Sequence, residues 1–517
     1  MHKKILVLGV EILTVINFAY SLENDYYTQV PSEPAFPLIS PRVKMIGQDF
    51  LGIISDIESD IIENPSLLSL LKYNEVNASF LPYVIDKIRY PISLSFLYPK
   101  LFSSRVGLGF QNQYVYSSKA TNYVINDMDV YQFYNFWAYQ QLLFISFSAT
   151  PNLNISPFYI ITKSPYRYKN EYNFPLEASN NFDYTHYSIS QLNYDYHSQQ
   201  FGLGMNYNWE RNSLQLATSL LKGNTKNNCN GQDSTWDIHC FQYCDTFGNS
   251  YRYYLYKDIS YDKDTLINQG AKQNYASRLS CRWCKELNNN EIINTFVDFR
   301  HTSEESTWTN LDSKLYIHID SNYYRWRNYP YPESTRITSD SIQDYYKYYT
   351  NTSGKHTETN LSIGFGYEIP ISHFVKSFVG IKSTFNFESD STRREYTTVG
   401  YTDSTSDTTT TSRYSAQKNT RFIVSVPAGW EYIRLNPLII RWGVNFRSFH
   451  EWISTKYDWD TLYTNQHNEY FEFVYSFGLG LKISQKLYIN AYNTGNLFST
   501  PWLFTINECG AQVRYIF

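Results

Sequence analysis

The segment FEFVYSFGLGLKI, residues 471–483, decides the fold because large apolar residues occupy every second position in it. Such a period of two is typical of a β-strand with one apolar face. Strands of soluble sheets usually have about five or six residues. This run is longer, and it reaches the about 9 to 11 residues that a strand needs to cross a bilayer. It therefore indicates a membrane-spanning strand.

Further runs of the same kind occur on both sides of this segment. They cover Phe201–Trp209, Phe422–Tyr432 and Leu438–Phe446. The alternate positions hold mainly Gly, Ser, Asn, Arg and Lys, which suit a wet lumen better than a second packed sheet. The sequence therefore predicts an all-β protein, a closed antiparallel transmembrane β-barrel of about 14 to 16 strands.

The connections between these runs support the same fold. Outer-membrane barrels have short turns on the periplasmic side and long loops outside. From the C-terminus backwards, long and tight links alternate, which predicts a periplasmic C-terminus and an even number of strands. The long links are 495–505, 452–468, 389–418 and 325–356, and the tight ones are 484–486, 434–437 and 370–372. The polar segments 223–248 and 389–418 are expected to be surface loops.

Composition removes several classes of protein. The chain of 517 residues has 44 Lys and Arg against 48 Asp and Glu, so its net charge is −4. This near-neutral balance lacks the excess of basic residues that nucleic-acid binding needs, and we expect no nucleic-acid partner. Aromatic residues make up 18% of the chain, which fits the belts of Tyr and Trp at membrane interfaces. No cofactor is expected.

The N-terminus has the pattern of an export signal. Basic residues from His2 to Lys4 precede an apolar stretch, Ile5–Phe18, and Ala19 and Ser21 supply the small residues of a cleavage site. We therefore expect a signal peptide at 1–21, an extended and helical segment at 22–103, and the barrel with long extracellular loops at 104–517.

A different period occurs before the barrel. Apolar residues recur at a spacing of three or four, which predicts one helix face, and the pair Asn64 and Pro65 is expected to end that helix. The stripe consists of Ile46, Phe50, Ile54, Ile57 and Ile61. This segment is interpreted as a plug in a pore, a periplasmic flap, or simple N-terminal packing.

The C-terminal residues Val513, Tyr515 and Phe517 alternate and end on an aromatic side chain. They resemble the C-terminal β-signal of Gram-negative outer-membrane proteins, although Gln512 stands where that signal often has Gly. The resemblance implies an outer-membrane location, contact with outer-membrane lipid, and recognition by the barrel assembly machinery.

A shorter resemblance includes Asn64 and Pro65. The segment NPSLL, residues 64–68, with Ser55 and Asp56 before it, is similar to the Asn-Pro segment of the long-chain fatty-acid transporter family. Ser66 replaces the Ala that is usual in that family. The resemblance implies an N-terminal plug and hydrophobic ligands that move by diffusion, whereas an Asn-Pro pair is also an ordinary helix stop.

Five cysteines lie in one region of the chain. In an exported protein such thiols usually pair, so we expect disulfides among them, with a zinc site or unpaired thiols as alternatives. They are Cys229, Cys240, Cys244, Cys281 and Cys284.

The sequence contains no Gly-x-Ser-x-Gly elbow and no His-Glu-x-x-His motif, so no catalytic residue and no metal ligand is assigned and no enzymatic activity is expected. The leading hypothesis is passive transport of small or hydrophobic solutes through the barrel. The alternatives are a surface barrel whose loops bind a partner, glycan or matrix, and, with less support, a barrel hydrolase.

Overall fold

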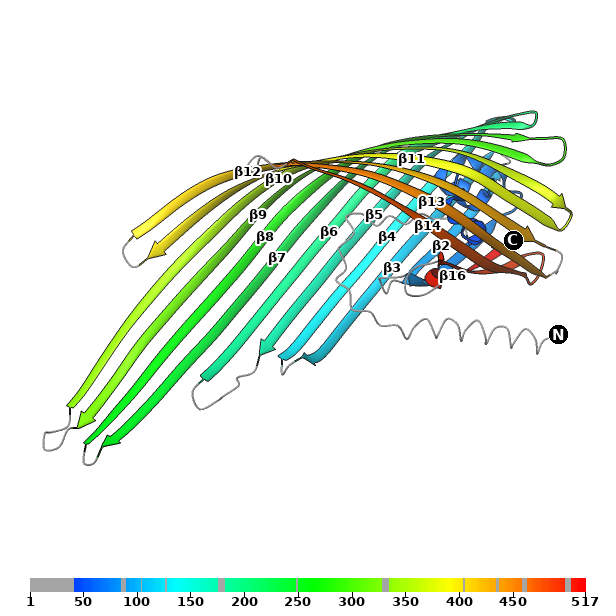
Figure 1. Ribbon diagram of the computed structural model, residues 1–517. Helices are drawn as coiled ribbons and strands as arrows, with labels where there is room; N and C mark the ends of the chain where they lie inside the picture. Colours follow the sequence, from blue (N-terminus) through cyan, green and yellow to red (C-terminus); the bar gives the residue numbers. More distant parts are fainter. Residues whose placement is uncertain are drawn as a thin grey trace, which may run out of the picture.

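The chain forms a closed antiparallel barrel (Figure 1). The computed structural model describes residues 41–84, 90–103, 105–125, 128–174, 182–247, 250–327, 334–402, 405–433, 437–457, 463–497 and 504–517. The expected signal peptide and the segment 22–40 lie outside these residues. Two α-helices and two 3-10 helices come first: α2 (Pro41–Ile46), η1 (Gln48–Phe50), α3 (Ile57–Glu63) and η2 (Pro65–Leu70).

Sixteen strands follow in the described chain, each antiparallel to the next. They are β1 (Glu75–Val84), β2 (Tyr90–Ser103), β3 (Val106–Ile125), β4 (Met128–Thr150), β5 (Leu153–Phe174), β6 (Phe182–Trp209), β7 (Asn212–Phe247), β8 (Ser250–Glu286), β9 (Ile292–Arg327), β10 (Ser334–Ser372), β11 (Val375–Thr402), β12 (Thr405–Tyr432), β13 (Leu438–Tyr457), β14 (Tyr463–Lys482), β15 (Leu487–Leu497) and β16 (Phe504–Ile516).

The barrel closes where β1 pairs with β16, with Glu75 opposite Ile516. All backbone groups of a closed barrel can pair between strands, so no sheet edge is left open. The expected all-β, closed antiparallel fold is confirmed, with sixteen strands at the upper end of the predicted number.

The barrel begins at Glu75 rather than at residue 104. Both β1 and β2 lie in the segment that the sequence assigned to the extended and helical region. Three prolines, Pro82, Pro91 and Pro99, interrupt the segment, and proline within a run argues against a strand. The alternation in this part of the chain was therefore missed.

The polar segments expected to be long loops are paired strands. The segment 389–418 forms the outer parts of β11 and β12, and 223–248 lies almost wholly in β7. Thr397 and Thr410 face each other across β11 and β12, with their hydroxyl oxygens 3.3 Å apart. Threonine and tyrosine favour strands, and cross-strand Thr pairs add stability without an apolar pattern. The prediction of long extracellular loops is therefore wrong for these segments.

Apolar and polar side chains separate to opposite faces of the strands. On β9, Val297 and Phe299 are 38% and 40% exposed on the outer face, whereas inward-facing Asn294 is fully buried. On β10, the outward apolar row extends from Leu361 to Ile371, which matches the about 9 to 11 residues of a bilayer-crossing strand.

Many strands continue far beyond this apolar band. On β9 the outward row becomes polar after Phe299, with His301, Ser303 and Thr307. The hairpins β7–β8 and β9–β10 reach furthest from the end that carries the C-terminus (Figure 1). The outer part of the barrel is thus an asymmetric polar wall.

Candidate functional site

The helical segment lies inside the barrel. We call residues 41–71 the plug; it is the blue coil inside the strands near the C-terminal end in Figure 1. In the plug, α2 contacts β12 to β16, η1 contacts β12, and η2 contacts β2 to β6. The plug therefore touches opposite parts of the barrel wall, and it crosses the lumen instead of packing outside it.

Hydrophobic burial anchors both halves of the plug. The first half packs around Phe50 and Ile53 against wall residues Phe296 and Phe378, and the rings of Phe50 and Phe378 meet edge to face at 6.2 Å. In the second half, Leu67 and Leu68 pack against Phe144. Each buried side chain of this size contributes about 1.5 to 3 kcal/mol.

The plug is not the single helix that the apolar spacing predicted. Gly47 and Gly52 have φ values of 131° and 82°, which interrupt the helix. Ile46, Phe50 and Ile54 are nevertheless buried as the pattern required. The apolar spacing therefore predicted correctly that these side chains are buried together. The backbone between them forms short helices and turns instead of one continuous helix.

The predicted plug residues Asn64 and Pro65 lie at the contact with the wall. The Asn64 side-chain oxygen accepts hydrogen bonds from the Ser66 amide and hydroxyl at 3.3 and 2.7 Å. Its amide nitrogen donates to the carbonyl of Met205 on β6 at 3.0 Å. Pro65 occupies the first turn of η2, where its missing N–H costs nothing.

Inward-facing glycines provide the space in which the plug sits. A Cβ at Gly366 on β10 would overlap the carbonyl oxygen of Ile53, and one at Gly443 on β13 would overlap that of Ile46. The wall is therefore shaped to accept plug backbone at direct contact, which glycine alone permits.

In the described structure, charged pairs join the plug to the wall at four points, one of which pairs Glu63 with Arg278 on β8. The first is Arg42, whose guanidinium lies 3.3 Å from Glu431 on β12 and 3.4 Å from Asp56 within the plug. Glu431 also accepts from Arg441 on β13 at 2.6 Å. One buried wall carboxylate thus holds cations from both the plug and the neighbouring strand.

The second point is Asp49. Its carboxylate accepts from Arg447 on β13, from Asn445 and from Ser425, each at 2.7 Å. Burial alone would raise the pKa of Asp49, but Arg447 and these hydrogen bonds outweigh burial and hold the pKa below its ordinary value.

The third point is Asp60, which lies 2.6 Å from Arg282 on β8, both side chains being under 10% exposed. Arg282 also donates to the carbonyl of Ile54 at 2.5 Å and to Asn294 at 3.0 Å. Burial raises the pKa of the Asp60 carboxyl to about 6, with Arg282 opposing that rise.

A narrow seam remains between the plug and β7 to β9. Its volume is about 40 Å³, and Asp60, Glu63, Arg278 and Arg282 contribute to its lining. This is room for a water molecule among polar partners.

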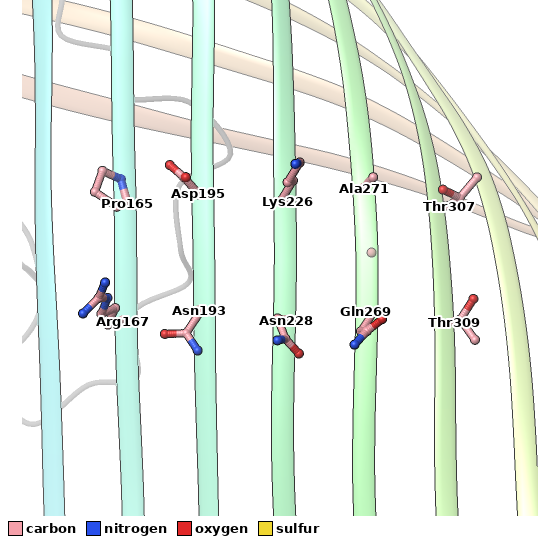
Figure 2. Close-up of a pocket in the computed structure, with 11 residues that line it drawn as sticks. Pro165, Arg167, Asn193, Asp195, Lys226, Asn228, Gln269, Ala271, Thr307 and Thr309 are labelled. Atoms are coloured by element: carbon pink, nitrogen blue, oxygen red, sulfur yellow. The ribbon is translucent and has the colours of Figure 1, made fainter.

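A larger hollow lies on the outer face of the strands. It has a volume of about 650 Å³ and spans β5 to β9, with Arg167, Asp195 and Lys226 among the side chains around it (Figure 2). Asn193, Asn228, Gln269 and Thr309 add amides and a hydroxyl. The hollow can offer hydrogen bonds and charges of both signs to a ligand outside the barrel.

The structure contradicts a disulfide at two of the predicted cysteines. Cys281 and Cys284 are free thiols. Cys281 on β8 lies opposite Leu216 on β7. Cys229 is thirteen residues further along β7 than Leu216, whereas a disulfide needs the two Cα atoms within about 7 Å of each other. The side chains of Cys229, Cys240 and Cys244 lie outside the described part of β7.

The C-terminal residues form the closing strand. Val513, Tyr515 and Phe517 are 42%, 45% and 42% exposed on the outer face, and β16 pairs with both β1 and β15. The structure places them at the seam of the barrel. Their role as an assembly signal stays a prediction.

The charged wall residues of the site were missed from the sequence. A signal for them exists, because Arg441 interrupts an apolar strand and Gly364 and Gly366 recur at the spacing of one strand face. Such residues indicate an inner face that contacts something other than water. Their partners in the plug lie hundreds of positions away, so no local pattern identifies them.

Among the described residues, no helix has the length and apolar character to cross a membrane. No protein-family model and no curated protein matches the sequence.

Solved structures of barrels resemble this one distantly. A deltaS2S3 mutant of the TodX monoaromatic hydrocarbon channel aligns over 93% of this chain and 98% of its own, at 10% identity and a TM-score of 0.34. The FrpB iron transporter from Neisseria meningitidis aligns over 92% of this chain and 87% of its own, at 8% identity and a TM-score of 0.28. The copper transporter OprC aligns over 86% and 80%, at 9% identity and a TM-score of 0.27. Similarity at this level carries no inference about what this chain does.

Proposed function

We propose that this chain is an outer-membrane β-barrel that lets small solutes cross and that the plug controls their passage. The observation that carries the proposal is the plug itself, a folded segment seated inside a closed barrel. Wall glycines and charged pairs fit the plug to the lumen. No catalytic role is assigned to any residue.

The outer face supports a membrane location. Its apolar row on β10, from Leu361 to Ile371, has the length of a bilayer crossing, and neighbouring strands carry matching rows. A closed barrel also satisfies its backbone hydrogen bonds without water, as hydrocarbon requires. The export pattern at 1–21 and the C-terminal aromatic strand agree with an outer-membrane location.

The contacts of the plug support gating. Ion pairs and hydrogen bonds hold much of it, and the charged wall groups that it covers would be hydrated in an open lumen. Removing one partner of a buried pair costs about 3 to 5 kcal/mol, whereas separating both into water costs less because each regains hydration. The plug can therefore move without breaking a covalent link.

The inner wall beyond the plug favours water-soluble solutes. Inward-facing positions there include Glu304, His356, Glu388, Arg421 and Glu451. A polar lumen of this kind is typical of a water-filled channel and unlike an apolar binding groove. We therefore place small polar solutes before the hydrophobic ligands that the fatty-acid transporter resemblance implies.

Solute efflux from proteoliposomes tests the proposal. Vesicles with the full-length protein, loaded with sugars of increasing size or with a monoaromatic probe, should release the smallest polar solutes faster than protein-free vesicles. Equal release from both kinds of vesicle, with the protein inserted and folded, would reject the transport function.

The outer hollow favours a second candidate, a barrel that binds a partner or glycan at the cell surface. Arg167, Asp195 and Lys226 stand on the outward face beyond the apolar band, where an external ligand can reach them. In that case the protein would bind a ligand at this wall while vesicle efflux stayed at the background level.

A further inference from the structure

The outer ends of β13 and β14 bring together two imidazoles and one carboxylate. His450 on β13 lies directly opposite Glu469 on β14, and His467 is two residues before Glu469 on the same face. The three side chains are 29%, 46% and 50% exposed, respectively for His450, His467 and Glu469. They belong to the outward face and are separate from the plug.

The distances suit a shared cation. The Nδ1 atom of His450 lies 3.1 Å from Oε1 of Glu469, and Nε2 of His467 lies 3.4 Å from the same oxygen. All three ligand atoms are within 4.8 Å of one another. Around a tetrahedral metal with bonds of about 2.1 Å, two ligand atoms lie about 3.4 Å apart. The cluster therefore needs little movement to bind a metal.

Neighbouring side chains orient both rings. The Oγ atom of Ser448 lies 3.1 Å from Nε2 of His450, so an Nε2–H can donate to it and leave the Nδ1 lone pair toward Glu469. Trp452 stacks on His467 at 5.0 Å and on His450 at 6.2 Å, with interplanar angles of 9° and 17°. A hydrogen bond from the second ring nitrogen, like that of His450 to Ser448, is typical of metal-binding histidines.

We propose that His450, His467 and Glu469 form a site for a divalent transition metal such as Zn²⁺ or Cu²⁺. Imidazole nitrogens select these ions over Mg²⁺ and Ca²⁺, which prefer oxygen ligands. The exposed side of the cluster leaves the remaining coordination positions to water. The bound ion joins the outer ends of β13 and β14, independently of any transport function.

A second cluster provides the matched control. On the inner face, His356 lies 2.6 Å from Asp390 and 3.8 Å from Glu388. It has one imidazole among carboxylates, and a bound ion would have to replace the direct 2.6 Å hydrogen bond between His356 and Asp390. His356→Ala therefore removes a histidine beside carboxylates without touching the proposed site.

The test uses tag-free, full-length protein in detergent, with ZnCl₂ binding measured by competition with a chromophoric chelator. Wild-type protein and His356→Ala should bind one ion with equal affinity. His467→Ala and Glu469→Gln should lose the site, and Ser448→Ala should weaken it about tenfold. Heat-modifiable gel migration confirms that each variant is folded.

Spectroscopy with Cu²⁺ identifies the ligands. The wild-type spectrum should show hyperfine coupling to two imidazole nitrogens, and that of His467→Ala to one at most. Binding that is unchanged in His467→Ala and Glu469→Gln, or that is lost in His356→Ala, would overturn the proposal, as would a wild type that binds no ion.

Discussion

The carboxylate of Asp60 in the plug lies 2.6 Å from the guanidinium of Arg282 on the barrel wall. The two residues are separated by more than 200 positions in the sequence, and both are buried. Arg282 also holds the carbonyl of Ile54, so one wall side chain grips the plug at two places.

Arg282→Ala should loosen the plug. The substitution leaves the Asp60 carboxylate buried without its cation, which costs about 3 to 5 kcal/mol in the docked state. Single-channel recordings should show open events far more often than in the wild type. As a control, Arg393→Ala breaks the exposed pair with Glu395 and should leave the recordings unchanged. If both variants opened equally often, the pair of Asp60 and Arg282 would not control opening.

Gly366→Val should displace the plug by steric exclusion. Its side chain would occupy the position of the Ile53 carbonyl, so the plug cannot stay seated. Limited proteolysis should cleave the plug in this variant and spare it in the wild type. Gly354→Val is the matched control, since Gly354 lies on the same strand and the same face but faces Ser306 instead of the plug. If the plug of Gly366→Val stayed protected from the protease, the contact between Gly366 and the Ile53 carbonyl would not be needed to hold the plug.

Plug docking should weaken as the pH rises from about 4 to about 6. The pKa of Asp60 is about 6 when docked, above its ordinary value of 3.8, so the docked state binds the proton more tightly. This contribution is complete below the ordinary value and is lost as the pH rises through about 6, by at most about tenfold per pH unit. Asp49, whose pKa is lowered, loses its contribution only at more acidic pH.

The measurement for this effect is the open probability at several pH values. It should rise between about pH 4 and pH 6 in the wild type, and the rise should be absent in Asp60→Asn, which cannot titrate. An identical pH profile in the variant would assign the effect to another group.

Val297→Arg should destabilise the inserted barrel by about 2 to 4 kcal/mol, because it places a charge on the outer face within the apolar band. Thr307→Arg, on the same face of β9 but beyond the band, should cost about 0 to 1 kcal/mol. Urea unfolding in lipid vesicles measures both free energies. Equal costs at the two positions would contradict the placement of the bilayer.

The strand pattern was predictable because it is local. A strand with one face in an apolar environment must alternate, and the runs ending at Tyr432 and Ile483 show this directly. The turn at Pro151 and Asn152 agrees with the preference of proline and asparagine for turns. The even number of strands followed from the alternation of the links.

The outer strands and the site were not predictable in the same way. Thr408 to Thr411 form part of β12, yet both faces there are polar and the sequence shows no period. The ion pair of Arg282 with Asp60 forms only when tertiary folding brings the two residues together. Local sequence reports which face a residue occupies, whereas it does not report which distant residue it meets.

Single-channel conductance of the full-length protein and of a variant lacking residues 41–71 tests the central claim most directly. With folding confirmed by heat-modifiable migration, the deletion should convert a closed or small-conductance barrel into one with large, steady conductance steps. If the folded deletion variant conducts no more than the full-length protein, the segment does not control a pore, and the proposed function is contradicted.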